Sequence, residues 1–455
     1  MSRKQRIKKG VDIRLSGRPA DTVISAPSAS VYAVKPPDFT GVTPKLCVRI
    51  GDVVEAGTCI FYDKKTPSVQ FVSPVAGTVK EIVRGAKRRI LAVEIDASEN
   101  NVYKDFGVLD VNQSDKNAIL SRVLEGGMFP YFRQRPFDVV ANPEDAPRSI
   151  YVSGFDSSPL AASTSVALEG RMSDFQNGID ALAKLGGAGG VHLGIKNLDA
   201  TLAGVRNCEI TEFEGPHPSG NVGIQLHHTA PLSKGEVVWT IGYQDVANLG
   251  AMLSSGKYIP TKVVAVGGSE CASPQHVKTL AGASVSSIVN VPEAASNGDS
   301  VRVISGSPLT GDQISKNDYI GAFHSAIALL AEGSEPKFII TEGWLGLGLK
   351  RFSLNHSFPT WLMPKSKEWD LDTNMGGEER AFVVTGEYEK VFPMDIYPQH
   401  LIKSIIVNDI DSMEKLGIYE VAPEDFALCE YGCTSKIPVQ KLVREGLDNL
   451  RNELG

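Results

Sequence analysis

The spacing of hydrophobic residues changes along the chain, and this change is the strongest constraint on its fold. Up to about residue 100, short β-type runs such as Thr78–Val83 alternate with glycine and proline turns. From about Ile150, predicted strands at Ile150–Val152 and Val191–Ile195 alternate with predicted helices. The chain has 455 residues, which is more than one hydrophobic core accommodates. We therefore expect a multi-domain protein that combines α/β and α+β domains.

Two short motifs, Gly51–Gly57 and Ser73–Val79, stand out in the first hundred residues. Each places glycine where the backbone needs a positive φ, and Pro74 presets the turn into the next strand. A strand is predicted at Leu46–Ile50, just before the first segment. Together the two segments resemble the halves of a biotinyl/lipoyl-like barrel. Residues 1–100 are therefore expected to form a biotinyl/lipoyl-like all-β barrel-sandwich domain.

Residues 101–256 are expected to form a Rossmann-like α/β domain, because strands and helices alternate there. Within it, Ser173–Gln176 matches a capping box, which predicts that a helix begins at this point. A strand is predicted at Val237–Ile241, and a further helix is predicted to end before Gly256.

Residues 257–332 are expected to form a small α+β domain of the β-grasp type, similar to SLBB domains, that opens with the strand Val263–Val266. The apolar run Ala326–Ala331 is predicted to be the middle of an amphipathic helix. Residues 333–455 are expected to form a mixed segment that becomes helical from Asp395 and ends in a helical bundle.

Composition excludes several classes of function. Lys and Arg number 46 against 53 Asp and Glu, for a net charge of −7, so the clustered basic face that nucleic acid requires is not expected. No apolar stretch reaches the roughly 20 residues that cross a bilayer. The basic start, Met1–Gly10, is not followed by the apolar region of a secretion signal. The six cysteines lack framework spacing, so we expect a cytoplasmic chain without disulfides.

Three motifs that suggest chemistry have simpler structural interpretations. The cluster Gly186–Gly190 follows a predicted helix and precedes a strand, the reverse of a phosphate-binding loop, so a helix end and turn are favoured over nucleotide binding. Cys429 and Cys433 cannot complete a zinc site or an iron–sulfur site from their neighbourhood. Lys64 and Lys65 lie near the place of a modified lysine in a carrier domain, but an unmodified basic loop is favoured.

Two segments carry the candidate binding residues. Phe129–Phe137 packs aromatic rings and the two guanidinium groups of Arg133 and Arg135 into one loop. Such a mixture suits a planar ring or a partner surface, although we favour aromatic rings wedged between two domains. The segment Gly215–His228 holds three of the eight histidines on a backbone fixed by prolines, and here ordinary turn structure and a functional role are evenly balanced.

Five segments in order resemble one family. They are Ile7–Ile13, Asp63–Val79, the Gly-Pro-His-Pro segment at Gly215–Pro218, Glu387–Ile396 and Glu424–Cys429. With these segments the chain resembles the A subunit of the sodium-translocating NADH:quinone reductase, over nearly its whole length. That family is similar in architecture to the C subunit of the Rnf complex and to the flavin subunit of respiratory complex I.

The chain departs from those relatives where they hold a flavin. A glycine-rich loop of the relatives corresponds here to Glu125–Phe132, in which bulky side chains replace the glycines. Because Cβ atoms and rings occupy the space that glycines would leave, a flavin phosphate could not approach this backbone. The relatives' nucleotide-binding glutamates are also missing from the segment Val152–Pro159.

The resemblance implies a peripheral subunit on the cytoplasmic face of the bacterial inner membrane. It implies no flavin, NADH site, iron–sulfur cluster, metal or catalytic residue in this chain, with flavins and iron in partner subunits, chiefly membrane-embedded ones, and quinone as the substrate of the complex. The alternatives are an independent soluble FMN/NADH dehydrogenase and a biotin or lipoyl carrier-like module. The candidate contacts to quinone or a partner are Phe129, Tyr131, Phe132, Arg133, Arg135, His217 and His227.

Overall fold

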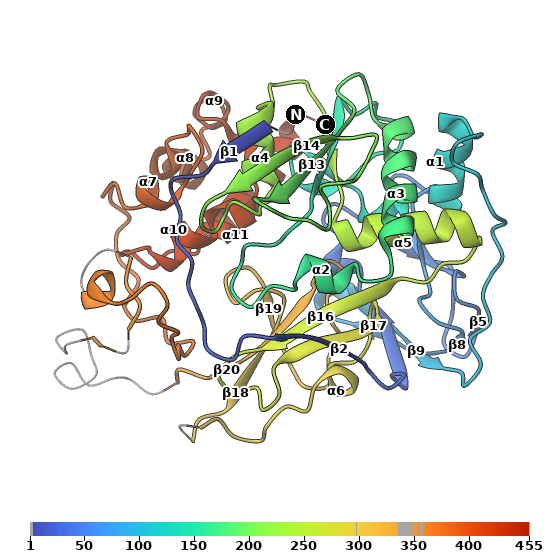
Figure 1. Ribbon diagram of the computed structural model, residues 1–455, viewed down its shortest axis with the longest axis horizontal. Helices are drawn as coiled ribbons and strands as arrows, with labels where there is room; N and C mark the ends of the chain where they lie inside the picture. Colours follow the sequence, from blue (N-terminus) through green and yellow to red (C-terminus); the bar gives the residue numbers. More distant parts are fainter. Residues whose placement is uncertain (1–2, 297, 335–347, 350, 355–357, 455) are drawn as a thin grey trace.

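The computed structural model describes residues 3–296, 298–334, 348–349, 351–354 and 358–454. The remaining parts of the predicted basic start and of the predicted mixed segment at 333–455 lie outside the described residues. The described strands form four sheets, and helices cover the larger ones (Figure 1). Mixed α/β domains are thus combined with an all-β region, as the periodicity predicts.

The largest sheet has seven strands, and its central part is parallel. In spatial order the strands are β1 (Arg3–Arg6), β14 (Glu209–Glu214), β13 (Val191–Lys196), β12 (Ser149–Ser153), β15 (Val238–Thr240), β10 (Arg133–Arg135) and β11 (Val139–Val140). The three strands predicted within this region, at Ile150–Val152, Val191–Ile195 and Val237–Ile241, correspond to β12, β13 and β15. Helices α1 (Lys116–Glu125), α3 (Met172–Leu185), α4 (Val222–Thr229) and α5 (Tyr243–Ser255) accompany this sheet, and the short helix α2 (Thr164–Ala167) contacts strands β16 and β2 of the next sheet.

Helices α3 and α5 pack closely because each has a glycine at the contact. A Cβ atom on Gly250 would collide with the carbonyl oxygen of Asp174, and one on Gly178 would collide with that of Val246. Helix α5 ends as predicted at Gly256, whose φ of +69° is the left-handed conformation that glycine adopts without strain. The capping box predicted at Ser173–Gln176 is wrong, because α3 already begins at Met172 and its cap position makes no side-chain hydrogen bond.

A second sheet of six strands follows in the sequence. Its order is β19 (Asp312–Ile314), β18 (Val301–Ser305), β20 (Ala326–Ala331), β16 (Thr261–Gly267), β17 (Gln275–Leu280) and β2 (Ala20–Ser25), with helix α6 (Val285–Ile288) beside it. The helix predicted at Ala326–Ala331 is wrong: this run is strand β20, buried at every position. The strand lies between β18 and β16, and a strand covered on both faces is continuously apolar, so periodicity alone cannot distinguish it from a buried helix.

Two small sheets form the N-terminal barrel-sandwich. One contains β3 (Val31–Val34), β9 (Ile90–Ala97), β8 (Gly77–Arg84) and β5 (Val53–Val54), and the other contains β4 (Pro44–Leu46), β6 (Cys59–Asp63) and β7 (Gln70–Val72). The strand predicted at Leu46–Ile50 is only partly correct, because β4 ends at Leu46. One ladder bond continues, since the Cys47 amide donates to the Ile60 carbonyl at 2.9 Å.

The first 25 residues do not belong to these barrel sheets. Strand β1 pairs with β14 of the seven-stranded sheet, and β2 pairs with β17 of the six-stranded sheet. Figure 1 shows this N-terminal strap as the dark blue trace that runs from one sheet to the other. The predicted domain of residues 1–100 therefore supplies an edge strand to each of the two domains that follow it.

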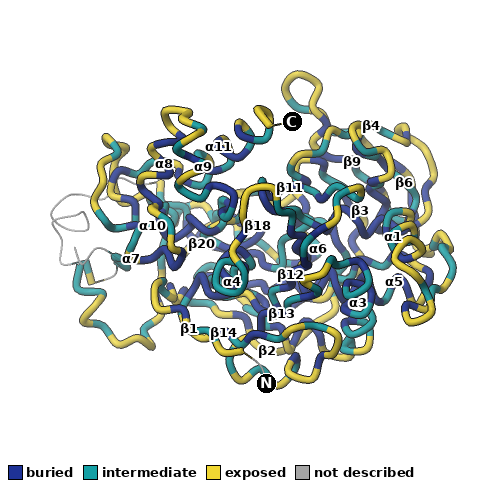
Figure 2. The backbone as a smooth tube through the Cα atoms, turned by 90° about the horizontal axis from the view of Figure 1, so that it is seen from above, coloured by how far each residue is buried: buried dark blue, intermediate teal, exposed yellow. Residues whose placement is uncertain are grey.

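The C-terminal part of the chain is helical from Tyr388, close to the predicted position. Its helices are α7 (Tyr388–Val391), α8 (Pro398–Ile406), α9 (Ile410–Lys415), α10 (Ala427–Tyr431) and α11 (Val439–Leu454). Their inner faces are buried (Figure 2), and Leu401 and Val443 share one hydrophobic cluster with Ile7, Phe213 and Ile224. Short 3-10 turns complete the described elements at η1 (Pro36–Asp38), η2 (Ala86–Arg88), η3 (Phe129–Tyr131), η4 (Pro359–Leu362), η5 (Ile418–Glu420) and η6 (Pro423–Phe426).

Candidate functional site

The aromatic segment after helix α1 lies at the junction of three domains. Phe129 and Phe132 stack at 5.4 Å between ring centroids, and both pack edge-on to Trp239 of β15, at 5.5 and 5.7 Å. Tyr131 contacts Phe39 beside the barrel and Phe323 of the six-stranded domain, at 6.3 and 6.0 Å. These side chains of the segment are buried. Tyr131 therefore packs between domains, whereas Phe129 and Phe132 pack on Trp239 within their own domain.

The two glycines that remain in the segment also touch neighbouring side chains. A Cβ on Gly127 would collide with Val72 of the barrel, and a Cβ on Gly126 would come within 2.8 Å of the Met252 sulfur of α5. The backbone between helix α1 and Phe129 is therefore enclosed by side chains. Little space is left there for a phosphate to reach the amide groups.

Arg135 is the centre of a buried ion network. Its side chain is 1% exposed, its Nη2 donates to Glu424 Oε1 at 3.0 Å, and it lies 3.5 Å from an oxygen of Asp138 and 3.6 Å from one of Asp425. Arg133 also pairs with Asp138, and its guanidinium lies 5.4 Å from the ring centroid of Phe323. The network joins strand β10 to turn η6 of the C-terminal part.

The carboxyl groups of this network titrate differently because their surroundings differ. Burial alone would raise the pKa of Asp138, but the positive charges of Arg133, Arg135 and Arg444 outweigh it and hold that pKa below its usual value. For Asp425, burial dominates and raises the pKa even though Arg135 opposes this effect. Arg135 thus favours the charged form of all three carboxyl groups, but only Asp138, which also has Arg133 and Arg444 nearby, ends with a lowered pKa.

The histidine segment forms a second junction, between helix α4 and the C-terminal helices. His227 Nδ1 lies 2.8 Å from Glu420 Oε2, and its Nε2 accepts from the Asp395 amide at 3.0 Å. His228 Nε2 donates to the Pro393 carbonyl at 2.8 Å. Both imidazoles are held in place by hydrogen bonds with residues of the C-terminal part of the chain.

His217 occupies a buried position against the N-terminal strap. Its backbone amide donates to Asp12 Oδ1 at 2.8 Å, and its Nδ1 lies 3.0 Å from Ser157 Oγ. Its Nε2 has no hydrogen-bond partner among the described residues. Burial lowers the pKa of His217, against the smaller opposing effects of Asp156 and Asp12. The imidazole is therefore neutral near pH 7.

The two candidate segments are linked through Glu424, which was not among the candidate contact residues. Asn221 Nδ2, at the start of α4, donates to the Glu424 carbonyl at 3.2 Å, and Arg135 contacts the Glu424 side chain. Glu424 and Asp425 lie in one of the five segments that carry the family resemblance, which was the available signal for them. His217 and His227 belong to different contacts, so the seven candidates do not form one cluster.

Two of the motifs with structural interpretations can be placed in the fold. The cluster Gly186–Gly190 forms the turn between α3 and β13. Cys429 and Cys433 are buried in the C-terminal core, where the Tyr388 hydroxyl donates to the Cys433 sulfur at 3.0 Å. Across the described chain, no three His, Cys, Asp or Glu side chains are grouped to hold a metal ion.

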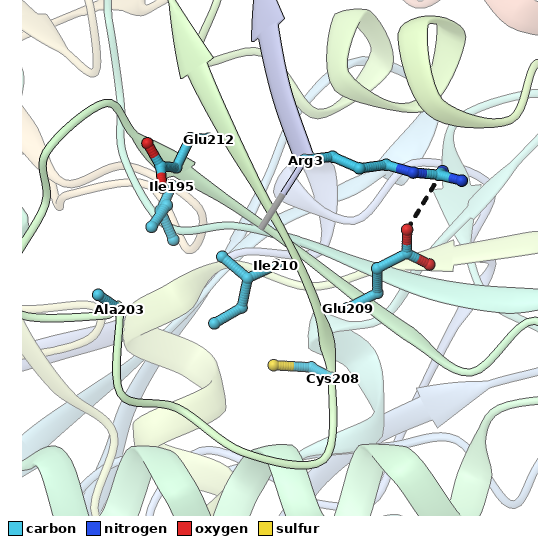
Figure 3. A pocket seen from close by; sticks show the side chains of 7 residues that line it. All are labelled: Arg3, Ile195, Ala203, Cys208, Glu209, Ile210 and Glu212. Atoms are coloured by element: carbon cyan, nitrogen blue, oxygen red, sulfur yellow. Dashed lines mark ion pairs between the residues drawn. The ribbon is translucent and has the colours of Figure 1, made fainter. Parts of the chain in front are cut away.

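A pocket of about 450 Å³ lies at the edge of the seven-stranded sheet, beside β1 and β14 (Figure 3). Its charged groups are already engaged: Arg3 pairs with Glu209 at 3.2 Å, and Lys4 pairs with Glu212 at 3.2 Å. Burial, with a smaller contribution from Asp180, raises the pKa of the Cys208 thiol in this pocket to about 11. This thiol is therefore not a nucleophile near neutral pH.

Comparison with known proteins decides the family. Residues 5–98 match the NqrA N-terminal barrel-sandwich hybrid domain, residues 114–258 match the NqrA second alpha/beta domain, and residues 263–316 match the NQRA C-terminal domain. The A subunit of the Na(+)-translocating NADH-quinone reductase of Rhodopirellula baltica is 35% identical over 455 residues, which cover 98% of both chains. The chain belongs to the NqrA family, the A subunits of Na(+)-translocating NADH-quinone reductase.

Other relatives carry the same name. The NqrA protein of Saccharophagus degradans is 33% identical over 451 residues, covering 98% of this chain and 99% of the relative, and that of Haemophilus influenzae is 34% identical over 456 residues with the same coverage. Among solved structures, an NAD+-reducing [NiFe]-hydrogenase in the air-oxidized state is 12% identical with a TM-score of 0.37, covering 74% of this chain and 63% of that one. That likeness is too distant to carry an argument.

In this member of the NqrA family, no described helix has both the length and the apolar character that a membrane span requires. Several histidines have a lowered pKa, and His217 and His324 are two of them. His324, which follows Phe323 in the sequence, is partly buried, and its Nδ1 lies 2.9 Å from Ser305 Oγ. Burial, followed by the nearby charges of Lys35, Lys262 and Arg133, lowers the pKa of His324 to about 3.

We expect His324 to make the fold acid-sensitive. Unfolded histidine titrates near pH 6.5, so below that pH the unfolded state binds a proton that the native state refuses, and stability falls by up to about 1.4 kcal/mol per pH unit. The variant His324→Gln should lose less stability between pH 7 and pH 5 than the unmodified chain. Melting temperatures across this range measure the effect, with the exposed His400→Gln as the matched control. Equal pH profiles for the unmodified chain and His324→Gln would contradict the assignment.

Proposed function

We propose that this chain works within a Na+-translocating NADH-quinone reductase, a translocase that passes electrons from NADH to quinone and exports Na+, as its A component. The single observation that carries the proposal is the match to a relative of that name over 98% of both chains. The relatives from Saccharophagus and Haemophilus bear the same name, and it describes neither an independent dehydrogenase nor a carrier module. The complex, rather than the isolated chain, is the active enzyme in this proposal.

The chain itself carries no flavin, NADH site or iron–sulfur cluster in our proposal, so these groups belong to partner subunits. The support is steric. Val72 and Met252 press on the two remaining glycines of the segment Glu125–Phe132, and the aromatic side chains after them are buried. Electrons then pass through other subunits, and this one contributes shape and contacts.

The finer fold and domain assignments belong to the same proposal. The parallel order β14-β13-β12-β15 supports a Rossmann-like domain over residues 101–256, and the mixed sheet around β16 supports a β-grasp-like domain over residues 257–332. The packing of α8 with α9 and α11 supports a helical bundle that ends the segment 333–455. The barrel-sandwich domain occupies the rest, residues 1–100.

We place the approach of quinone or of a membrane-embedded partner near the two junctions, on the cytoplasmic face of the bacterial inner membrane. Arg133 and His227 keep exposed side-chain area, 29% and 12%, so they are the groups that a ligand or partner reaches directly. The other five proposed residues are buried, so a ligand or partner does not reach them directly. The full proposed set is Phe129, Tyr131, Phe132, Arg133, Arg135, His217 and His227.

Affinity purification tests the proposed function. A tagged chain drawn from gently solubilised bacterial membranes should bring membrane-embedded subunits with it and show Na+-stimulated NADH-quinone reductase activity. The purified chain alone should lack the visible absorbance of a flavin. Recovery of the chain without partners, or as a yellow protein that oxidises NADH, would overturn the proposal.

The contact residues have their own readout in the assembled complex. The variants Arg133→Gln and His227→Gln should lower quinone reductase activity. The control Arg3→Gln should not lower it, because it changes an exposed ion pair on strand β1, at the other edge of the seven-stranded sheet from β10. If all three variants have equal activity, these residues touch neither quinone nor partner.

A further inference from the structure

Two cysteines of the barrel face each other at its surface. The Sγ atoms of Cys47 and Cys59 are 2.7 Å apart, closer than two unbonded sulfur atoms normally pack. Cys47 is exposed and Cys59 is half-buried, so a small solute reaches Cys47 first. The residues are only 12 positions apart in the sequence, yet their spacing matches no known disulfide framework.

The local backbone explains why the two thiols meet. Leu46 pairs with Phe61 across β4 and β6, and the next rung joins Cys47 to Ile60. In a regular ladder, Cys59 would point to the other face from Ile60 and so away from Cys47. The pairing of β6 with β7 shifts in register between Cys59 and Phe61. Such an irregularity in a strand changes the direction in which a side chain points.

We propose that Cys47 and Cys59 form a redox-active dithiol that hydroperoxides oxidise to a disulfide. The Cys47 sulfur attacks the O–O bond of hydrogen peroxide, which gives a sulfenic acid at Cys47 and releases one water. The Cys59 sulfur then attacks the Cys47 sulfur, forms the S–S bond and releases the second water. Two thiols and one peroxide thus become one disulfide and two waters, a two-electron oxidation of the protein.

The order of the two steps follows from the surroundings of the thiols. Burial and the contact with Cys47 raise the pKa of Cys59, against a smaller effect of Lys104, so Cys59 is the poorer first nucleophile. Its position against Cys47 nevertheless suits it to resolve the sulfenic acid. Reversible disulfides of this kind occur in reducing compartments, where structural ones are rare.

The disulfide would act on a loop that exposes hydrophobic side chains. Residues 48–58 lie between the two cysteines and include the short strand β5, which pairs with β8; within them Ile50 is 63% and Val53 is 82% exposed. A bond from Cys47 to Cys59 closes this loop and restricts the conformations open to it. The redox state of the pair therefore controls how rigidly the loop is presented to a partner.

The test uses the full chain, purified under reduction and then freed of reductant. After a pulse of hydrogen peroxide, remaining thiols are alkylated and the protein is digested with trypsin, which cuts after Lys45, Arg49 and Lys64. The two cysteines then lie in separate peptides. We expect one cross-linked species, about 2 Da lighter than the two peptides together, which dithiothreitol returns to alkylatable thiols. Cys208 and Cys271, both half-buried, should stay alkylatable.

Single substitutions separate the roles. In Cys59→Ser, Cys47 should accumulate as sulfenic acid that dimedone labels at least about tenfold more than in the unmodified chain. The control Cys271→Ser should still form the cross-link. Alkylation of Cys47 and Cys59 equal to that of Cys271 after peroxide, or oxidation of Cys47 to sulfinic acid without a cross-link, would overturn the proposal. Neither result depends on the assignment of the chain to a complex.

Discussion

Replacing Arg135 by alanine should lower the free energy of unfolding by about 3–5 kcal/mol, because it removes the positive charge beside the buried Asp425 and one of the three beside Asp138. Asp138 and Asp425 are almost completely buried and both pair with this guanidinium. Removing one member of such a network costs more than the network contributes, since the remaining charges stay out of water. Urea denaturation, monitored by the fluorescence of Trp239, measures the change.

The control for Arg135→Ala is Arg3→Ala, which removes an exposed ion pair with Glu209. Both side chains of that pair are well exposed, at 68% and 45%, so we expect a loss of at most about 1 kcal/mol. A small loss for Arg135→Ala, similar to the control, would mean that water reaches Asp138 and Asp425. A large loss also affects interpretation of activity, because Arg135 variants would then report on folding rather than on quinone.

Phe132→Ala should destabilise the chain by a similar amount, about 3–5 kcal/mol, through a cavity in the core beside the seven-stranded sheet. The ring is fully buried and packs on both Phe129 and Trp239, which come from different elements of the same domain. Because Trp239 belongs to strand β15 and Phe129 to turn η3, the surrounding rings have little freedom to collapse into the space. The melting temperature and the urea midpoint measure the loss.

Two variants calibrate this result. Phe132→Leu keeps most of the volume, so its cost should be about 1.5 kcal/mol or less. Tyr397→Ala removes an aromatic side chain that is 68% exposed, and its effect should stay within about 0.5 kcal/mol. If Phe132→Ala were as mild as Tyr397→Ala, the segment would be a mobile loop open to ligands instead of a wedge.

Hydrophobic spacing predicted the elements whose structure depends on residues close together in the sequence. The strands β12, β13, β15 and β16 and the helix α5 follow from hydrophobic spacing, because each buries one face or one continuous run. The run Ala326–Ala331 failed for the same reason: its six apolar residues carry no period, and only its place between two other strands makes it extended.

Pairings between distant residues could not be predicted in this way. Strand β1 is built of Arg, Lys and Gln, which have no apolar alternation, and it is ordered by hydrogen bonds to β14. Similarly, Arg135 was a candidate because of its aromatic neighbours, but its partner Glu424 lies 289 positions away. Neither local sequence indicates that Arg135 and Glu424 form an ion pair, so the pairing is known only from the structure.

The N-terminal strap has a consequence for how the chain is made. Strands β1 and β2 leave the ribosome well before their partners β14 and β17, which are synthesised only around residues 209–214 and 275–280. Both early strands must wait while some 200 or more residues emerge, so their edges stay unpaired during translation. The polar composition of β1 suits that delay, because a charged nascent segment resists aggregation until its docking sites exist.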